Sequence, residues 1–526
     1  MDTDRTVNVV GAGLSGLSAA LSLASKGFKC NLISSMPSER AQSVLAEGGI
    51  NAALDTMGEN DTEGEHFNDT MKGGCYIESE SAVRNLTYNA PDVVRSLVKL
   101  GVPFQSESGR LILRNFGGQP KKRTAYAKSS TGKMIMTALI AEVRKYEETG
   151  FVVRYPHHEL TDMTMEDGRL ISITVRDNFT GEYFSFSGCT ILCTGGMNGF
   201  FEGMTTGTTQ DTGNAAAVAF SRGVCFTDLE FIQYHPTTVQ ICDKRMLISE
   251  AARGEGGRLF ALRDSLPWYF MEEKYPQLGN LMPRDVISRE MAFIQRDLGD
   301  DVIYLDLRGL DDKVWENRLS DMRDEIMSYL HTDPKEKPIP VSPGIHYFMG
   351  GIRVNDRHQS SVKGLYAAGE AAGKYHGANR LGGNSMLGAI FGGRVAAENA
   401  SLEAGEVIIE RTDKTTGDRS SFALRKELED ILLSGLGIIR ESSEMGYALE
   451  KTEDILKRDD IPVIDRYRTL LGRAMLLSAI GRKESRGAHY RKDYPESSDD
   501  YKKISLARYV NGDIKISFTE ASSEVE

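Results

Sequence analysis

The sequence is poor in cysteine, and it has no long apolar run. Its six cysteines form no Cys-x-x-Cys pair, and only Cys189 and Cys193 lie close together. The usual patterns of iron–sulfur clusters and zinc sites are therefore absent, and a disulfide framework is not expected. This cysteine usage fits a reducing compartment, so we predict a cytoplasmic protein without a metal site.

No stretch approaches the roughly 18 consecutive apolar residues of a transmembrane helix, so we predict no direct membrane insertion. The first predicted strand starts close to Met1, which leaves no room for a signal peptide. Blocks of Lys and Arg with interleaved aromatic residues are also absent, and the formal net charge is −12. Both facts argue against nucleic-acid binding and against binding to acidic membranes. An anionic ligand would therefore need a local cluster of cations.

The N-terminal residues predict a dinucleotide-binding turn. Thr6 to Val10 has the β-branched composition of a short strand, and an Ala- and Leu-rich helix runs to about Gly27. Glycines between them allow a tight turn and the close approach of a pyrophosphate, whose charge the helix N-terminus favours. The residues of this turn that we expect to bind the cofactor are Gly11, Ala12, Gly13, Ser15 and Gly16.

The next predicted strand, Phe28 to Ser34, ends without an acidic residue. Ser34 and Ser35 stand where an acid usually meets the adenosine ribose of NAD. Its absence disfavours NAD and leaves FAD as the predicted dinucleotide, with both serines in the FAD site.

A second ligand signature lies far along the chain, from His376 to Ser385. It reads His-Gly-Ala-Asn-Arg-Leu-Gly-Gly-Asn-Ser, and it follows the pair Gly369 and Glu370. The guanidinium of Arg380 can bind a carboxylate through two parallel hydrogen bonds, and the glycines let backbone approach a ligand closely. Arg380 is therefore our first candidate for a substrate anchor.

The glycine-rich motifs fall into two separate stretches, which suggests a domain with an insertion. We predict an α/β fold with a Rossmann-like FAD-binding domain formed by residues 1–222 and 352–408. Residues 223–351 are predicted to form an inserted α+β capping domain, so a pocket should lie where the two meet. From 409 to 526 we predict a helical C-terminal domain with a polar tail, acidic from Glu520 onward and of the kind that is often disordered.

The inserted segment carries several residues that could do chemistry. His235 precedes a proline, which favours an extended turn, and Glu250 and Arg253 have the i, i+3 spacing of a helix. Arg284 opens a predicted helix, where a cation is electrostatically disfavoured, so it needs another reason to be there. His346 lies in a second turn. Taken one at a time, each of these residues is more typical of a structural role than of a functional one. Together they form a set of charged and polar side chains that could bind a small dicarboxylate.

With these motifs the chain resembles a known family, the flavoprotein subunits of succinate dehydrogenase and fumarate reductase. L-aspartate oxidase is also similar to this family. The resemblance runs from Val7 to about Pro495. It rests on an ordered series of motifs: Gly11–Gly16, Gly48–Gly49, Phe116–Gln119, Gln233–Thr237, Glu250–Gly256, Pro283–Asp285, His346–Tyr347, Gly369–Glu370, His376–Ser385, Glu484–His489 and Asp493–Pro495.

The resemblance implies hydride transfer between flavin N5 and one carbon of a C4 dicarboxylate. Arg284 would give and take the proton, and Glu250 and Arg253 would relay protons from solvent. The residues implied to hold or press on the substrate are His235, Ser249, His346, Arg380 and Phe116. The residues implied to contact the flavin are Gln42, Ser43, Glu47, Gly48, Gly49, Thr194, Gly195, Asn214, Gly369, Glu370, Arg380, Asn384 and Ser385.

Some positions depart from the family pattern. Gln42 stands where many members carry the histidine that attaches FAD covalently, so we expect non-covalent FAD and the fumarate-reducing direction. Asn214 replaces the usual aspartate of a flavin contact, which removes a charge but keeps a hydrogen-bonding group. Glu47 and the run His66–Met71 are similar to the thiol-linked fumarate reductases of methanogens.

Two alternatives stay open at this stage. L-aspartate oxidase shares the fold and non-covalent FAD, but the segment Phe116–Gln119 resembles the dicarboxylate reductases more closely. A catalytically silent flavin-binding subunit is disfavoured, because every matched proton-transfer position is retained. In the fumarate reductase, electrons would come from a partner such as an iron–sulfur subunit or from a diffusible reductant.

Overall fold

The computed structural model describes residues 5–128, 130–242, 244–298, 303–413 and 419–525. Its first layer is a parallel sheet whose strands are, in spatial order, β22 (Leu365–Ala367), β12 (Thr190–Leu192), β1 (Thr6–Val10), β2 (Lys29–Ser34) and β8 (Val152–Pro156). The predicted strand, glycine turn, helix and strand at the N-terminus are confirmed. The Rossmann-like fold class is confirmed with them.

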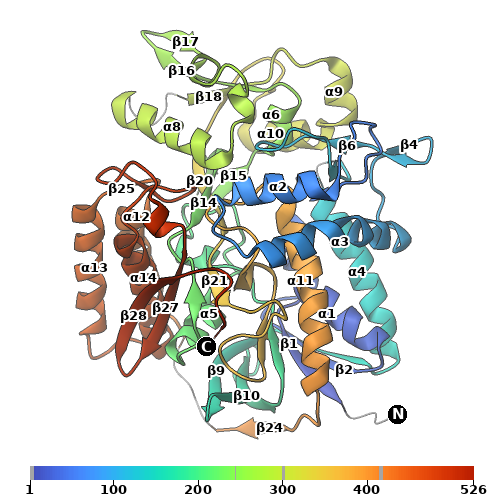
Figure 1. The fold of residues 1–526 in the computed structure, drawn as a ribbon, viewed down its shortest axis with the longest axis vertical. Helices are drawn as coiled ribbons and strands as arrows, with labels where there is room; N and C mark the ends of the chain where they lie inside the picture. The colour runs from blue at the N-terminus through green and yellow to red at the C-terminus, as the bar shows by residue number, and fades with distance from the viewer. Residues whose placement is uncertain (1–4, 129, 243, 299–302, 414–418, 526) are drawn as a thin grey trace.

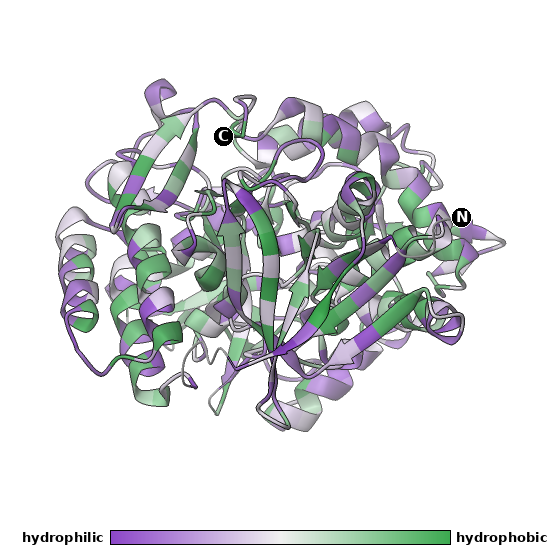
Figure 2. Cartoon of the chain, turned by 90° about the horizontal axis from the view of Figure 1, so that it is seen from below, coloured by the Kyte–Doolittle hydropathy of each residue, from purple (hydrophilic) through white to green (hydrophobic). Residues whose placement is uncertain are grey.

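Helices cover one face of this sheet, and antiparallel strands pack on the other (Figure 1). Helices α1 (Leu14–Ser25), α4 (Thr131–Glu148) and α11 (Asn384–Ala400) pack on its strands. Helix α3 (Glu80–Lys99) packs on α11, α2 (Glu63–Gly73) packs on α3, and α5 (Asn214–Ser221) packs on the antiparallel strands. The outer helices alternate polar and apolar residues along their length (Figure 2). Short strands near the turn are β3 (Ile50–Asn51), β6 (Leu113–Arg114) and β7 (Thr124–Ala125).

Helices α1 and α11 pack closely because glycine leaves room between them. A side chain at Gly393 would come within 2.3 Å of the carbonyl oxygen of Ser15. Helix α11 starts at Asn384, so this packing brings the end of the His376–Ser385 motif to the N-terminal turn. The two ligand signatures of the sequence are therefore neighbours in space.

A four-stranded antiparallel sheet lies beside the parallel sheet. Its strands are β9 (His158–Glu166), β10 (Arg169–Asp177), β11 (Tyr183–Ser187) and β24 (Ile409–Thr412). Strand β24 pairs with β11, although it lies just beyond the expected domain end at residue 408. We propose to extend the FAD-binding domain to Thr412 for this reason.

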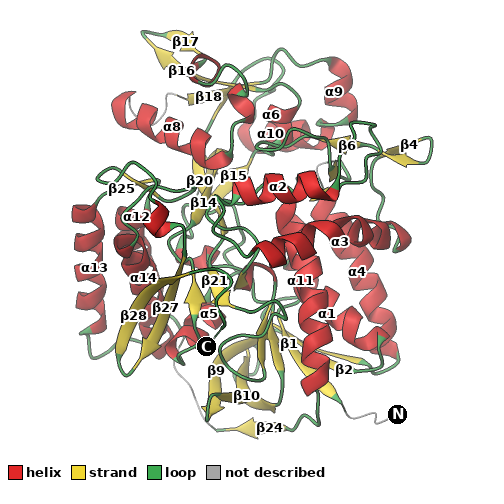
Figure 3. Ribbon diagram, in the orientation of Figure 1, coloured by secondary structure: helices red, strands yellow, loops and turns green. Residues whose placement is uncertain are grey.

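The inserted segment forms the upper part of the molecule in Figure 3. One of its sheets contains β14 (Ile232–Ile241), β15 (Lys244–Leu247) and β20 (Ser342–Phe348), and the other contains β16 (Arg258–Arg263), β17 (Leu266–Trp268), β18 (Ile303–Asp306) and β19 (Ile339–Pro340). Its main helices are α6 (Ala251–Gly254), α8 (Arg284–Leu298), α9 (Asp312–Asn317) and α10 (Ser320–Leu330). Trp315 and Met291 belong to a hydrophobic core that this segment has for itself.

The C-terminal domain is helical, as predicted, with three α-helices among its described residues, and it ends in strands that we did not predict. The helices are α12 (Phe422–Leu436), α13 (Ser442–Leu456) and α14 (Val463–Gly481). The hairpin of β27 (Ile504–Val510) and β28 (Asp513–Thr519) extends a sheet with β13 (Phe226–Thr227), β21 (Gly351–Arg353) and β23 (Ala372–Gly373). The tail after it is held as well, because Arg353 Nη2 donates to the Ala521 carbonyl at 3.1 Å.

Within the described part of the chain, no helix is both long enough and apolar enough to cross a membrane.

Candidate active site

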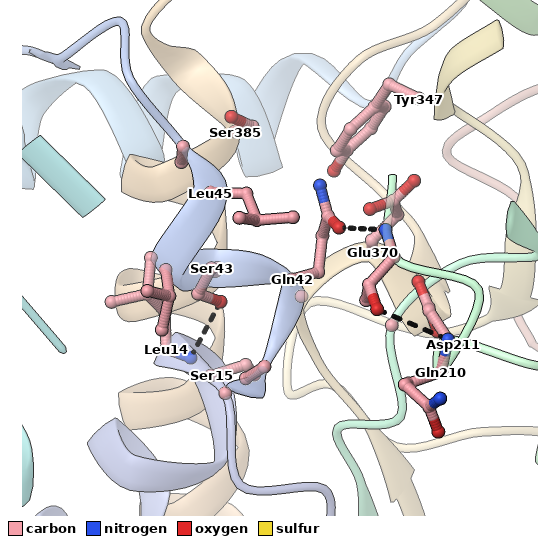
Figure 4. A pocket seen from close by; sticks show the side chains of 18 of the residues that line it. Leu14, Ser15, Gln42, Ser43, Leu45, Gln210, Asp211, Tyr347, Glu370 and Ser385 are labelled. Carbon is pink, nitrogen blue, oxygen red and sulfur yellow. Dashed lines mark hydrogen bonds between the residues drawn. The ribbon is translucent and has the colours of Figure 1, made fainter. Parts of the chain in front are cut away.

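A cavity of about 540 Å³ lies between the N-terminal glycine turn and the capping strands. Figure 4 shows the side chains of Ser43, Gln42 and Glu370 around it. The predicted cofactor residues that line it are Gly11, Ala12, Gly13, Ser15, Ser34, Ser35, Gln42, Ser43, Glu47, Gly48, Gly49, Thr194, Gly195, Asn214, Gly369, Glu370 and Ser385. The predicted catalytic residues that line it are Phe116, His235, Ser249, Glu250, Arg284, His346 and Arg380.

Arg284 and Glu250 form the most strongly connected pair of the site. Arg284 is the first residue of α8, and its Nε and Nη2 atoms donate to Glu250 Oε2 at 2.9 and 2.6 Å. Glu250 Oε1 accepts from the Gly117 backbone N–H at 3.1 Å and lies 3.4 Å from Arg253 Nη2. All three charged side chains are buried. The ion pair with Glu250 is the reason for a cation at the start of α8.

Arg380 reaches the same place from the other domain. Its Nη2 donates to Gln233 Oε1 at 2.9 Å, and Arg284 Nη1 donates to the same oxygen at 3.1 Å. A second link joins Asn379 Nδ2 to Asp285 Oδ1 at 2.8 Å. The loop of Arg380 and the helix of Arg284 are thus tied side by side.

The two predicted histidines face each other beside these arginines. The ring centres of His235 and His346 are 5.2 Å apart, and Thr206 Oγ1 lies 2.8 Å from His346 Nδ1. Burial, with Arg284 nearby, holds the pKa of both histidines well below the usual range. Both rings are therefore neutral at pH 7, and each can donate one N–H to an anion.

Buried polar atoms at this end lack partners. His235 Nε2 and Arg380 Nε have no hydrogen-bond partner among the described residues. Burial, then the charge of Arg284, lowers the pKa of Arg380 to about 9, so it stays charged at pH 7. Buried donors without partners are costly unless a ligand meets them, which fits an anionic substrate.

The other end of the cavity fits a dinucleotide. Helix α1 begins here without a side-chain cap of its own, and the Leu14 N–H donates to Ser43 Oγ at 3.1 Å. The neighbouring backbone N–H groups at this helix start suit a pyrophosphate. Gln42 Oε1 accepts from the Thr208 N–H at 2.5 Å and so joins two walls of the cavity.

Three predicted site residues do not line the cavity. Gly16 packs on the glycine turn, since a side chain there would meet the Gly11 carbonyl oxygen at 1.8 Å. Arg253 lies behind Glu250, with Nη1 donating to the Asn280 carbonyl at 2.7 Å. The side chain of Asn384 bonds instead to the buried residues Asn51, His66 and Thr70, which lie behind the cavity lining.

The sequence interpretation missed several residues of the site. Gln233 was noted as the first residue of the motif Gln233–Thr237 but given no role, and it bridges the two arginines. Tyr347 was noted within a motif but given no role, and its ring lies 4.5 Å below the Arg380 guanidinium. Thr206 and Asp211 lie in a polar loop, where no pattern distinguishes them from ordinary surface residues.

Comparison with known proteins gives a consistent result over nearly the whole chain. The family model "FAD binding domain" matches residues 6–386, and the model "Fumarate reductase flavoprotein C-term" matches residues 425–525. The succinate dehydrogenase flavoprotein subunit of Bacillus subtilis is 35% identical over 555 residues, which cover 97% of this chain and 94% of that protein. A subunit of the fumarate reductase (CoM/CoB) of Methanothermobacter marburgensis is 33% identical, with 95% and 96% covered.

Among solved structures, a mutated FrdA of E. coli quinol fumarate reductase superposes with a TM-score of 0.88 at 28% identity. That match covers 99% of this chain and 97% of the other. The Bacillus and Methanothermobacter relatives are almost equally identical to this chain, so the comparisons do not single out the methanogen type. The chain belongs to the family of FAD-dependent oxidoreductases formed by the flavoprotein subunits of succinate dehydrogenase and fumarate reductase.

Proposed function

We propose that this protein reduces fumarate to succinate and that Arg284 delivers the proton. The observation that carries the proposal is the double hydrogen bond from Arg284 to the buried carboxylate of Glu250, at the wall of a cavity lined with further cations. FAD supplies the hydride chemistry when it is bound. The protein itself binds, orients and protonates the substrate.

Charge balance supports a dicarboxylate. Arg253, Arg284 and Arg380 bring three positive charges, and among the described residues Glu250 is the carboxylate that forms ion pairs with Arg253 and Arg284. Two negative charges on the substrate would neutralise the remainder. We assign the carboxylates to His235 and Ser249 at one end and to His346 and Arg380 at the other. Fixing both ends orients the substrate, which is a large part of the catalytic effect.

The proton path runs through Arg284, Glu250 and Arg253. Burial alone would raise the pKa of Glu250, but the charges of Arg284 and Arg253 outweigh it, and its pKa is lowered. Glu250 is therefore ionised and can accept a proton from the solvent side. Arginine rarely releases its proton in proteins. A guanidinium bound to a carboxylate can nevertheless give a proton to a developing carbanion while Glu250 returns one, and its charge stabilises that carbanion.

Gln42 supports two finer points of the proposal. Its amide is bound to the Thr208 N–H and offers no nucleophile, so we propose that FAD is held without a covalent bond. Covalent attachment is associated in this family with a higher flavin potential, and its absence favours the fumarate-reducing direction. Acid precipitation tests this point, because non-covalent flavin should stay in the supernatant. Yellow precipitated protein would contradict it.

We also propose that electrons reach the protein from a separate donor. The similar proteins of Bacillus and Methanothermobacter are named as subunits, and an iron–sulfur subunit is the partner that we propose first. A diffusible reductant is the alternative donor.

The test is turnover of the purified FAD-containing protein with a reduced viologen as electron donor. We expect consumption of viologen on addition of fumarate, with succinate as the product. Ammonia and peroxide released from L-aspartate, without fumarate turnover, would instead indicate an L-aspartate oxidase. No turnover with either substrate, while FAD stays bound and the viologen reduces it, would indicate a silent subunit.

A further inference from the structure

Asn214 stands where the family has an aspartate, but its side chain is engaged away from a ligand. Its Nδ2 atom donates to Glu159 Oε1 at 2.7 Å, and its Oδ1 atom accepts from Arg468 Nη1 at 3.0 Å. Arg468 also donates to the Thr212 carbonyl at 2.5 Å, so the contact is part of the packing of α14 on this loop. The acceptor that the family offers at this position is thus taken by the protein itself.

Asp211, three residues earlier, has the opposite arrangement. Its Oδ2 atom accepts from the Gly196 N–H at 3.0 Å and from Asn198 Nδ2 at 2.9 Å, which fixes the carboxyl group. Its Oδ1 atom has no hydrogen-bond partner among the described residues. Asp211 is only 8% exposed, and it lines the cavity. A fixed carboxyl group with one unused acceptor atom therefore lies in the wall of the cavity.

The backbone nearby is shaped around this carboxyl group. A side chain at Gly195 would come within 2.5 Å of Asp211 Oδ1, and one at Gly196 would come within 2.6 Å of Glu370 Oε1. Glu370 also accepts from the Phe348 N–H at 2.9 Å. Two consecutive glycines thus make room for two carboxyl groups on one wall of the cavity (Figure 4).

We propose that Asp211 is a cofactor-binding residue of this chain, which accepts a hydrogen bond from a hydroxyl group of FAD and replaces the acceptor lost at Asn214. The proposal rests on FAD binding and not on the direction of the reaction. Asp211 belongs to none of the recognised motifs. In this proposal it makes the hydrogen bond to FAD that the motif residue Asn214 no longer makes.

The charge of this wall selects a hydroxyl group as the partner. Asp211, Glu370 and Glu159 all line it, so a phosphate would be repelled here and belongs at the start of α1. A hydroxyl is a neutral donor, and it can bond to a carboxyl oxygen without the repulsion that a phosphate would meet. FAD carries hydroxyls on its ribityl chain and on its adenosine ribose, and both have the required chemistry.

The test is the rate at which FAD leaves the holoprotein on dilution, followed by the rise in flavin fluorescence. We expect Asp211→Asn, which keeps the shape of the side chain, to speed release roughly tenfold or more. Asp92→Asn, the same substitution at an exposed position of α3, is the matched control, and we expect its release rate to stay within about twofold of the wild type. Equal rates for Asp211→Asn and wild type, or an equally large effect from Asp92→Asn, would overturn the proposal.

Cofactor analogues make the test independent of any folding defect in the variants. The bound FAD is exchanged for analogues that lack one ribityl hydroxyl or the adenosine 2′-hydroxyl. We expect one of them to leave the wild-type protein roughly tenfold faster than FAD does, and to leave Asp211→Asn no faster than FAD does. The analogue that shows this coupling identifies the ribityl chain or the ribose as the donor. No coupling with any analogue overturns the proposal, whereas loss of fumarate turnover alone would not affect it.

Discussion

Glu250 and Asp211 are carboxyl groups buried in the walls of the same cavity, and their pKa values are shifted in opposite directions from the ordinary values. Glu250 is 3% exposed and has Arg284 and Arg253 as partners, which lower its pKa despite its burial. Asp211 is 8% exposed and has no cation within ion-pair distance among the described residues. Burial raises its pKa to about 7.

The difference teaches that burial alone does not decide the charge of a side chain. Removing a carboxylate from water disfavours its ionised form in both places, and the sign of the neighbours then sets the outcome. The cationic end of the cavity keeps Glu250 ionised and suits an anionic substrate. The wall formed by Asp211 and Glu370 suits a neutral hydrogen-bond donor, and its carboxyl groups have raised pKa values that favour their protonated forms.

The largest expected effect comes from removing the cation at the reacting end. In Arg284→Ala, fumarate reduction should fall by roughly a thousandfold or more, because both the proton donor and the charge that stabilises the carbanion are lost. FAD content should stay unchanged, since the side chain lies at the capping side. Steady-state assays with reduced viologen, together with the flavin absorbance per protein, measure both. An activity loss below tenfold would remove Arg284 from the proton path.

Removing the negative charge of Glu250 should have the next largest effect. Glu250→Gln leaves Arg284 and Arg253 buried without a counter-charge, so we expect kcat to fall roughly a hundredfold and thermal stability to drop. Glu250→Asp is the control, because it keeps the charge and should recover part of kcat. Equal activity of the two variants would mean that the charge of Glu250 is not needed.

Gln233 offers a smaller change at the same end. Its oxygen accepts from both Arg284 and Arg380, so Gln233→Leu removes the group that holds two like charges side by side. We expect KM for fumarate to rise roughly tenfold, because Arg380 loses its position, and kcat to fall by a smaller factor. The kinetics should be compared with those of Gln240→Leu, on an outer position of the same strand. An unchanged KM would contradict a positioning role.

The acidic wall predicts a modest pH effect on the FAD-free protein. The folded-state pKa of Asp211 is about 7, which lies above its ordinary value. The neighbouring Glu370, which also faces Arg380, has a folded-state pKa of about 8. Stability from the protonated forms is complete below the ordinary pKa and is lost as the pH rises through 7 to 8. Between pH 5.5 and 8, Tm of the wild type should therefore fall by roughly 2 °C or more beyond that of Asp211→Asn. Parallel pH profiles of the two proteins would show that Asp211 is ionised throughout.

Local patterns made much of this protein predictable. The first strand, the glycine turn and the helix from Leu14 are encoded by neighbouring residues, because periodicity and turn chemistry act over short distances. The start of α8 at Arg284 follows from its preceding proline in the same way. The family motifs then indicated which of these residues share one site.

Features that depend on distant partners were missed. Strands β27 and β28 form because β13, far earlier in the chain, offers a sheet edge, and no pattern within the last residues shows this edge. Asn384 matches a motif, yet its side chain binds Asn51 and His66 instead of lining the cavity. Strand β24 joins the FAD-binding domain for the same reason, since its partner β11 lies far away in the sequence.

The sequence by itself determined the fold class, the FAD-binding turn and the set of arginines and histidines that could hold a dicarboxylate. Those properties follow from residue types at short spacing, which act through local backbone geometry and fixed chemistry. Only the tertiary structure decided that Gln233 joins the two arginines, that Asn214 is engaged by Glu159 and Arg468, and that Asp211 keeps an acceptor without a partner among the described residues. Hydrogen bonding and charge are settled by which groups meet in space, and the chain brings these groups together from distant positions.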